Sequence, residues 1–274
     1  MSDTLAATCS ALHTSLKEGI LTIRLRAPGQ GNRLSPEMVF ALDDLWRRVA
    51  LESTVRVVVL QGSETDFSLG LDTQAFSQLL QSDAPRARTA LQALHQARAR
   101  VLPLLPQPVI GVVHGACHGA ALRLIEGCDI VLAAENAEFM LTADDAPLLA
   151  QHPDAAAGPE WLDASHLAAC APQGRRLSAR EAAEYGWVTH CHPQSTLDSQ
   201  VLELVQALAQ KDALALQFTK ETVAHVGSMS WDAAVSYTAA KFAEIKARQA
   251  GTDSTRASAV QSFLAGKSKP GLGG

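Results

Sequence analysis

Four short stretches rich in branched apolar residues stand out in the first half of the chain. The stretch Ile20–Arg26 places leucine or isoleucine at its odd positions and more polar residues at most even ones, the period of a half-buried strand. The stretches Val55–Leu60, Val109–Val113 and Ile130–Ala134 are apolar almost throughout. Continuous apolar runs of this length are typical of strands covered on both faces. The pattern therefore predicts four strands of a sheet buried within the protein.

Helical patterns lie between and after these strands. Ser35-Pro36, followed by apolar residues at helical spacing, predicts a helix with an N-cap serine and proline at its first position. Val201–Lys211 carries an apolar stripe typical of a helix, and the arginine-rich stretch Ala84–Arg100 predicts a solvated helix, with phosphate binding as the alternative. Strands alternating with helices, then more polar helical sequence, predict an α/β core at residues 1–195 and a helical region at residues 196–274.

Composition narrows the class of protein. A chain of 274 residues that is 47% hydrophobic and 19% charged can bury a sizeable core without disulfides or metals. Its formal net charge of -5 argues against nucleic acid as the main partner. The apolar runs are too short for membrane helices, and the N-terminus lacks a signal-peptide pattern. An odd number of cysteines without a C-x-x-C pair suits a reducing compartment, so we expect a cytoplasmic protein that binds neither membranes nor nucleic acid.

Two glycine-bearing turns follow predicted strands. The first is the stretch 66–72, DFSLGLD, and the second is the stretch 114–121, HGACHGAA, which precedes a helix expected to begin near Gly119 or Ala120. Glycine permits unusual backbone dihedrals, and the first N–H groups of a helix have no partner within it. Two such donors that converge on one point would stabilise an oxyanion or an enolate. Either turn alone is a weak signal, because glycine turns are common in α/β proteins.

Beyond these two turns, five ordered pieces of the sequence carry a resemblance to a known family. They are APGQGNRLSPEM, VRVVVLQGSETDFSLGLD, PVIGVVHGACHGAALRLIEGCDIVLAAENAEF, RRLSAREAAEYGWV and SFLAGKSKP. Over nearly its whole length the chain resembles the crotonase (enoyl-CoA hydratase/isomerase) superfamily, and VHGAC and GLD resemble its dienoyl-CoA isomerase branch. The resemblance implies an α/β fold built as a spiral of ββα turns, with a C-terminal helical region that forms trimers or dimers of trimers.

The resemblance also implies a substrate and the residues that bind it. The substrate would be an acyl-CoA thioester, with coenzyme A as part of the substrate and no separate cofactor. The paired N–H donors of the family's oxyanion hole correspond to Leu71 and Ala120, preceded by Gly70 and Gly119 in the substrate site. Relatives often have a basic residue between the early proline and the asparagine, where this chain has Gln30 and Gly31; Arg33, just after Asn32, could take its place. Phe263 and Lys267 match the aromatic residue and the lysine that approach the adenine end of CoA, often from a neighbouring subunit; a surface lysine is the alternative.

The sequence departs from the family where hydratases carry their two glutamates. The first position is Arg123 and the second, counted from Phe139, is Ala143. Arginine is not a base at neutral pH, and alanine transfers no proton, so hydration by two glutamates is not expected. A cation near the start of a helix also requires a partner. That partner could be Glu126, three residues on, the acidic pair Asp144-Asp145, or an anionic group of the substrate.

Other residues could transfer the proton instead. Aligned on proline and small residues, Asp154 falls where dienoyl isomerases place a catalytic aspartate, provided that three residues are inserted before it. Without the insertion that place falls on Gln151, and Asp154 would be a solvated loop residue; Asp144 could also slip into the second glutamate's place. His118 could exchange a proton with a bound acyl group, or could be packed under the turn with its N–H satisfied. His114 is expected to be structural.

The histidines and cysteines do not predict a metal site. Gly115 and Gly119 break any helix that would align His114 with His118, and His190 and His192 share a strand face without an evident third ligand.

These features predict an enzyme of CoA-thioester metabolism that stabilises a thioester enolate. Isomerisation, decarboxylation or C–C cleavage is expected in place of simple hydration. Two alternatives remain open. One is an acyl-thioester-binding protein with little or no catalysis, and the other is an enzyme that acts on acyl groups attached to a carrier protein.

Overall fold

A computed structural model of the chain describes residues 5–27, 29–63, 65–140 and 176–249. Its internal contacts divide the chain into two units, Met1–Gln210 and Lys211–Gly274. The predicted division after residue 195 and the role of the second part in trimer formation stay predictions. Each unit is described by itself below.

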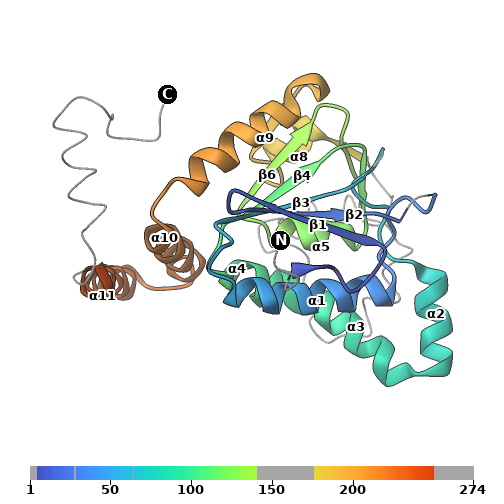
Figure 1. Cartoon of the computed structure of the whole chain (residues 1–274), viewed down its shortest axis with the longest axis horizontal. Helices are drawn as coiled ribbons and strands as arrows, with labels where there is room; N and C mark the ends of the chain where they lie inside the picture. Colours follow the sequence, from blue (N-terminus) through green and yellow to red (C-terminus); the bar gives the residue numbers. More distant parts are fainter. Residues whose placement is uncertain (1–4, 28, 64, 141–175, 250–274) are drawn as a thin grey trace. The chain divides into compact units, whose positions relative to one another are not determined.

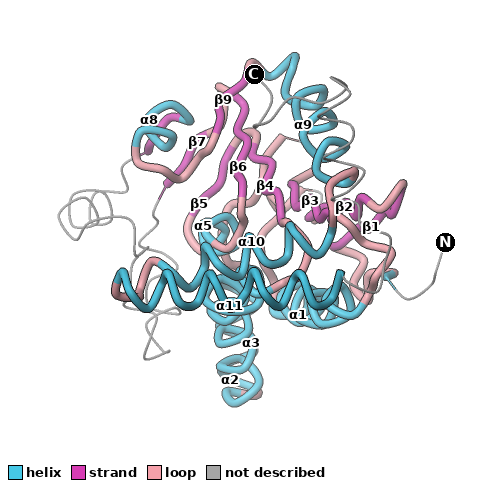
Figure 2. The backbone as a smooth tube through the Cα atoms, turned by 90° about the vertical axis from the view of Figure 1, so that its left-hand side faces the viewer, coloured by secondary structure: helices cyan, strands magenta, loops and turns pink. Residues whose placement is uncertain are grey.

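A six-stranded sheet forms the centre of the first unit, in the order β1-β2-β3-β4-β6-β9. Figure 2 shows these strands side by side from β9 to β1. β1 and β2 are antiparallel, and all other neighbours are parallel. The bounds of the strands are β1 Leu12–Lys17, β2 Ile20–Leu25, β3 Val57–Gln61, β4 Val109–Val113, β6 Ile130–Ala134 and β9 His190–His192.

The four predicted strands are confirmed, with two of them at their predicted bounds. β4 and β6 match because both faces of these strands are covered, which gives an unbroken apolar run with clear ends. β1 was not predicted. Its sequence, LHTSLK, has few apolar residues because it lies at the edge of the sheet. It joins β2 through Glu18 and Gly19, both with positive φ, which is typical of a tight hairpin turn.

The main sheet has two differently covered faces. Helices α1 (Pro36–Leu51) and α3 (Ala84–Gln96) lie against one face, where Leu60 and Val113 belong to the large core. Helix α9 (Gln194–Ala209) covers the other face, where Val59 and Val112 pack against α9 side chains that include Leu197. Figure 1 shows α1 and α9 on opposite sides of the strands. Side chains that alternate along a strand therefore enter separate cores.

A small second sheet consists of β5 (Ala116–His118), β7 (Glu138–Met140) and β8 (Arg176–Ser178). β5 and β7 are parallel, whereas β7 and β8 are antiparallel. Three-residue strands are too short to show a period in the sequence, so the sequence pattern of Ala116–His118 predicts only a turn. The middle residues of all three strands face the large core, among them Cys117.

The helices of the first unit follow the expected start and stop signals. Ser35 caps α1 by accepting a hydrogen bond from the N–H of Met38, and Pro36 occupies the first helical position, as predicted. The bounds of the helices are α1 Pro36–Leu51, α2 Thr73–Ser82, α3 Ala84–Gln96, a π-helical turn Ala97–Val101, α4 Leu102–Leu104, α5 Ala121–Glu126, α8 Ala179–Glu184 and α9 Gln194–Ala209.

The stretch Ala84–Arg100 is helical, as predicted, but it is not solvated throughout. One side of α3, including Leu91 and Leu94, is buried in the large core. The side chain of Arg98, in the π-helical turn, is only 11% exposed because it pairs with Glu126. The alternative of phosphate binding stays untested.

The second unit contains α10 (Ala213–Val226) and α11 (Trp231–Gln249). The rings of His225 and Tyr237 stack with their centroids 5.8 Å apart, and the Nζ of Lys241 lies 2.9 Å from an Oε of Glu221. These contacts join the two helices into a hairpin. Across the described residues of both units, no helix is long and apolar enough to cross a membrane.

Candidate functional site

The two glycine turns singled out in the sequence lie against each other. The N–H of Phe67 donates to the carbonyl of His114 at 3.0 Å, and the N–H of Ser68 donates to the carbonyl of Ala116 at 3.0 Å. In return, the N–H of His118 donates to the carbonyl of Ser68 at 2.9 Å. The turn after β3 therefore adds a short parallel ladder to the edge of β5.

The register of this ladder brings the two predicted oxyanion-hole residues into matching places. Ser68 pairs with Cys117 in parallel. Leu71 and Ala120 each follow their paired residue by three positions, and both are fully buried. Gly70 and Gly119, which precede them, have φ of 91° and 54°. Glycine adopts such angles readily, so the backbone can turn sharply just before each of the two predicted oxyanion-hole donors.

The Leu71 segment is fixed on its other side by the residues that follow β2. The N–H of Leu34 donates to the carbonyl of Gly70 at 2.8 Å, and the N–H of Asp72 donates to the carbonyl of Leu34 at 3.0 Å. Asp72 then caps α2 by accepting from the N–H of Ala75. Leu71 is thus held between two backbone hydrogen bonds and the start of a helix.

Asn32 is a positioning residue that the sequence interpretation did not identify. Its side chain is buried and makes four hydrogen bonds: Oδ1 accepts from the N–H of Ala27 and the hydroxyl of Ser63, and Nδ2 donates to the carbonyls of Ser63 and Asp66. Its φ is 51°, a conformation that asparagine tolerates better than most residues. An asparagine among glycines in the stretch 29–32 was the sequence signal for this residue. It does not reveal the role of Asn32, because most of its hydrogen bonds reach residues distant in the sequence.

Arg33 lies beside the same segment. Its Nη1 donates to the carbonyl oxygens of Leu69 at 3.3 Å and Leu71 at 3.1 Å. The guanidinium therefore supports the loop that carries a predicted oxyanion-hole donor. Its predicted contact with CoA stays a prediction.

Arg123 has the partner that helical spacing offered. Its Nη1 lies 3.5 Å from Oε2 of Glu126, and Nε of Arg98 lies 2.6 Å from the same oxygen. The Glu126 side chain is only 4% exposed. Burial raises the pKa of Glu126, while the charges of the two arginines oppose this shift; burial also lowers the pKa of Arg123. This contact favours a structural ion pair for Arg123 over a role in substrate binding.

His118 faces away from the large core. Its neighbour Cys117 points into that core, so by alternation the imidazole lies on the opposite face of the small sheet. There Nε2 is 3.3 Å from Oε1 of Glu138, which in turn lies 3.2 Å from Nη1 of Arg176. Burial lowers the pKa of His118, and the nearby Glu138 carboxylate opposes the shift. The contact with Glu138 favours a packed histidine, and proton transfer by His118 stays a prediction.

Several other residues considered from the sequence lie outside the described residues. They are Ala143, Asp144, Asp145, Gln151, Asp154, Phe263 and Lys267. Among the residues that are described, no group of three or more His, Cys, Asp or Glu side chains is placed to hold a metal ion.

Comparison with known proteins places the chain in a family. The family model described as enoyl-CoA hydratase/isomerase matches residues 15–265. The 1,2-epoxyphenylacetyl-CoA isomerase of Escherichia coli is 28% identical over 213 residues, which cover 76% of this chain and 79% of the relative. The hydroxycinnamoyl-CoA hydratase-lyase of Pseudomonas fluorescens is 22% identical over 259 residues, covering 94% of this chain and 93% of the relative.

Solved structures agree on the fold. An enoyl-CoA hydratase from Bacillus anthracis superposes with a TM-score of 0.79 at 22% identity, covering 94% of this chain and 97% of that chain. An enoyl-CoA hydratase from Shewanella pealeana gives a TM-score of 0.77 at 18% identity, covering 99% of this chain and 100% of that chain. The predicted crotonase-type α/β fold is confirmed. The chain belongs to the enoyl-CoA hydratase/isomerase family and is an acyl-CoA enzyme of the crotonase superfamily.

Proposed function

We propose that the backbone N–H groups of Leu71 and Ala120 hold the carbonyl oxygen of an acyl-CoA thioester and stabilise its enolate. The observation that carries this proposal is the parallel pairing of Ser68 with Cys117, because Leu71 and Ala120 each follow their member of that pair by three residues. Both residues are fully buried, so the electrostatic effect of donors there would be weakly screened by water.

An enolate forms whenever electrons from a bond at the α-carbon move into the thioester carbonyl. Loss of an α-proton, loss of carbon dioxide and cleavage of a C–C bond all do this, and each places negative charge on the carbonyl oxygen. The hole would therefore serve any of these reactions by stabilising that charge.

We favour isomerisation, decarboxylation or C–C cleavage over simple hydration. Arg123 stands where hydratases of the family have their first glutamate, and its contact with Glu126 supports a structural role there. An isomerase and a hydratase-lyase among the relatives are consistent with this range of chemistry. Asp154 and His118 are proposed as the groups that transfer the proton, and the substrate could be carried by CoA or by a carrier protein.

Exchange of the substrate α-proton with deuterium is the direct test of enolate formation. The wild-type protein should exchange the α-protons of at least one acyl-CoA in a panel of enoyl, dienoyl and carboxyacyl thioesters, followed by mass spectrometry. Ala120→Pro removes one donor at a residue with φ of -63°, which proline can adopt, and should slow exchange about 100-fold or more.

Ala179→Pro is the matched control, because it places proline at the first helical position of α8, after the extended residue Ser178, where proline is tolerated. Equal exchange by the two variants, with both folded by circular dichroism, would contradict the oxyanion-hole assignment. Binding without exchange or turnover of any thioester, on CoA or on a carrier protein, would instead support the binding-protein alternative. Turnover that survives Asp154→Ala combined with His118→Ala would overturn only the assignment of those two residues.

We also propose that the protein forms a homotrimer or a dimer of trimers. Four large apolar side chains of α10 and α11 are exposed: Val223, Trp231, Val235 and Phe242. Exposed apolar side chains of this size support contact with another protein surface, here a second copy of the chain. Light scattering should give a multiple of three chains, and a monomer would contradict the proposal.

A further inference from the structure

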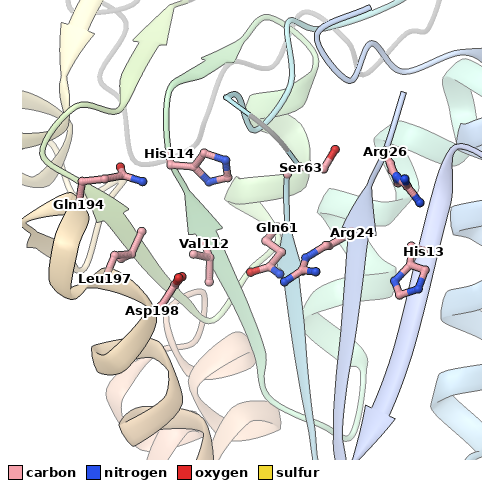
Figure 3. A pocket seen from close by; sticks show the side chains of 11 residues that line it. His13, Arg24, Arg26, Gln61, Ser63, Val112, His114, Gln194, Leu197 and Asp198 are labelled. Atoms are coloured by element: carbon pink, nitrogen blue, oxygen red, sulfur yellow. The ribbon is translucent and has the colours of Figure 1, made fainter. Parts of the chain in front are cut away.

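A cavity lies on the face of the main sheet that α9 covers. Its volume is about 480 Å³, and it is bounded by strands β1 to β4 on one side and by the first turns of α9 on the other (Figure 3). Its lining is mostly polar, in contrast to the apolar packing of α9 further along the same face. Cavities of about 300–1,000 Å³ are of the size that holds small organic molecules.

The carboxyl ends of three parallel strands meet at this cavity. Arg26 follows the end of β2, Ser63 follows β3 and His114 follows β4, and all three line the cavity. In open α/β sheets, ligands bind in the crevice outside the carboxyl ends of parallel strands. The position of the cavity therefore suits a ligand site.

The charge of the lining is predominantly positive. Arg24 of β2 and Arg26 just beyond it lie on the same side of the sheet, and among the described residues Asp198 of α9 is the only acidic one in the lining. Within the described part of the chain, neither arginine forms an ion pair with a carboxylate. His13 is the direct partner of Arg24 on β1, and its imidazole adds a further hydrogen-bond donor for an anion.

Arg24 is held in a fixed orientation by its other neighbour. Its Nε and Nη2 both donate to the amide oxygen of Gln61, at 2.6 and 2.9 Å, in the amide orientation that satisfies both groups. Gln61 is the direct partner of Arg24 on β3, and Figure 3 shows the two side chains meeting above the sheet. A guanidinium fixed in this way loses less conformational entropy when it binds a ligand.

The cavity is separate from the proposed thioester site. Leu71 and Ala120 belong to the core on the α1 face of the sheet, whereas the cavity lies on the α9 face. The strands of the sheet itself stand between the two. A ligand in the cavity would therefore be a second molecule and not a part of the acyl chain held by the oxyanion hole.

We propose that this cavity, lined by Arg24, Arg26, His13 and His114, binds a small organic anion through a carboxylate or phosphate group. Arginine forks match both groups in bidentate geometry. The volume exceeds what a bare inorganic ion requires, so the ligand is of metabolite size.

Calorimetric titration of the full-length protein with citrate and, separately, with inorganic phosphate tests the proposal. We expect saturable binding of at least one probe, and the stronger probe identifies the preferred group. Arg24→Gln and Arg26→Gln should each weaken binding about tenfold, equivalent to one lost charge-assisted hydrogen bond. Arg47→Gln removes an equal charge from an exposed arginine on α1 and should leave binding unchanged.

Three results would overturn the proposal. The first is that neither probe binds. If, in addition, a protein with both Arg24→Gln and Arg26→Gln has a different oligomer mass, the two arginines lie at an interface between copies of the chain. The second is that Arg47→Gln weakens binding as much as Arg26→Gln, which would indicate unspecific charge attraction. The third is that Arg26→Gln raises the KM for the acyl-CoA substrate, which would make the cavity part of the thioester site. Loss of enolate chemistry alone would leave this proposal standing, because citrate binding does not depend on it.

Discussion

Replacing Asn32 should both destabilise the protein and slow any reaction at the two glycine turns. The side chain makes four hydrogen bonds of 2.8 to 3.1 Å to three segments of backbone and one hydroxyl. Each contributes roughly 1 kcal/mol net, so Asn32→Gly should lower the free energy of unfolding by roughly 4 kcal/mol. Asn32→Ala should cost roughly 1 kcal/mol more, because alanine disfavours the positive φ of this residue.

Urea denaturation followed by circular dichroism measures both differences. Glu18 provides the matched control, since its φ is 50° and its side chain is exposed in the β1–β2 turn. Glu18→Gly should again be more stable than Glu18→Ala by roughly 1 kcal/mol. Neither variant should show the further loss of roughly 4 kcal/mol that removal of the Asn32 hydrogen bonds causes. An Asn32→Gly protein that unfolds at the wild-type urea concentration would refute the reasoning, because its hydrogen bonds would then contribute nothing.

Three further predictions concern single side chains around the site. Gly115→Ala should prevent stable folding, because a Cβ there would clash with the backbone carbonyl of Thr65. Gly186→Ala, with open space around it and also a positive φ, should cost only about 1 kcal/mol in a thermal melt. Burial lowers the pKa of His118, so the unfolded chain binds more protons and stability should fall as pH drops below about 6.5; His118→Gln should flatten this dependence in melts at several pH values. Glu126→Gln leaves two buried guanidiniums without their shared carboxylate and should cost roughly 3 kcal/mol in urea denaturation, against less than about 1 kcal/mol for Glu221→Gln in a more exposed pair.

The parts of the fold that local pattern determines could be predicted from the sequence. β4 and β6 were placed at their bounds because burial on both faces leaves no polar residue inside the strand, and Ser35 marked the start of α1 because its side chain caps the helix. The three strands of the small sheet were missed because three residues cannot show a period. Their pairing depends on contacts between distant segments.

The candidate site was predictable to a similar extent. The spacing of Arg123 and Glu126 on one helix allowed their contact to be predicted, but Arg98 comes from a helix turn far away in the sequence. The bonds of Asn32 and Arg33 to the loops around Leu71 likewise connect segments that only the folded chain brings together. Resemblance to the family, and not local pattern, identified Leu71 and Ala120 as a pair.

The ladder between the two glycine turns has an evolutionary consequence. Its bonds, from Phe67 to His114, from Ser68 to Ala116 and from His118 to Ser68, involve only main-chain atoms. Main-chain atoms are the same in nearly every residue type, so a side-chain change that keeps the backbone dihedrals and clashes with no neighbour leaves these hydrogen bonds in place. The side chain at position 123, which contacts Glu126, takes no part in these bonds, so its residue type can change without loss of the ladder. Duplicated genes with this fold can therefore vary the side chains around the two turns while inheriting the same main-chain frame.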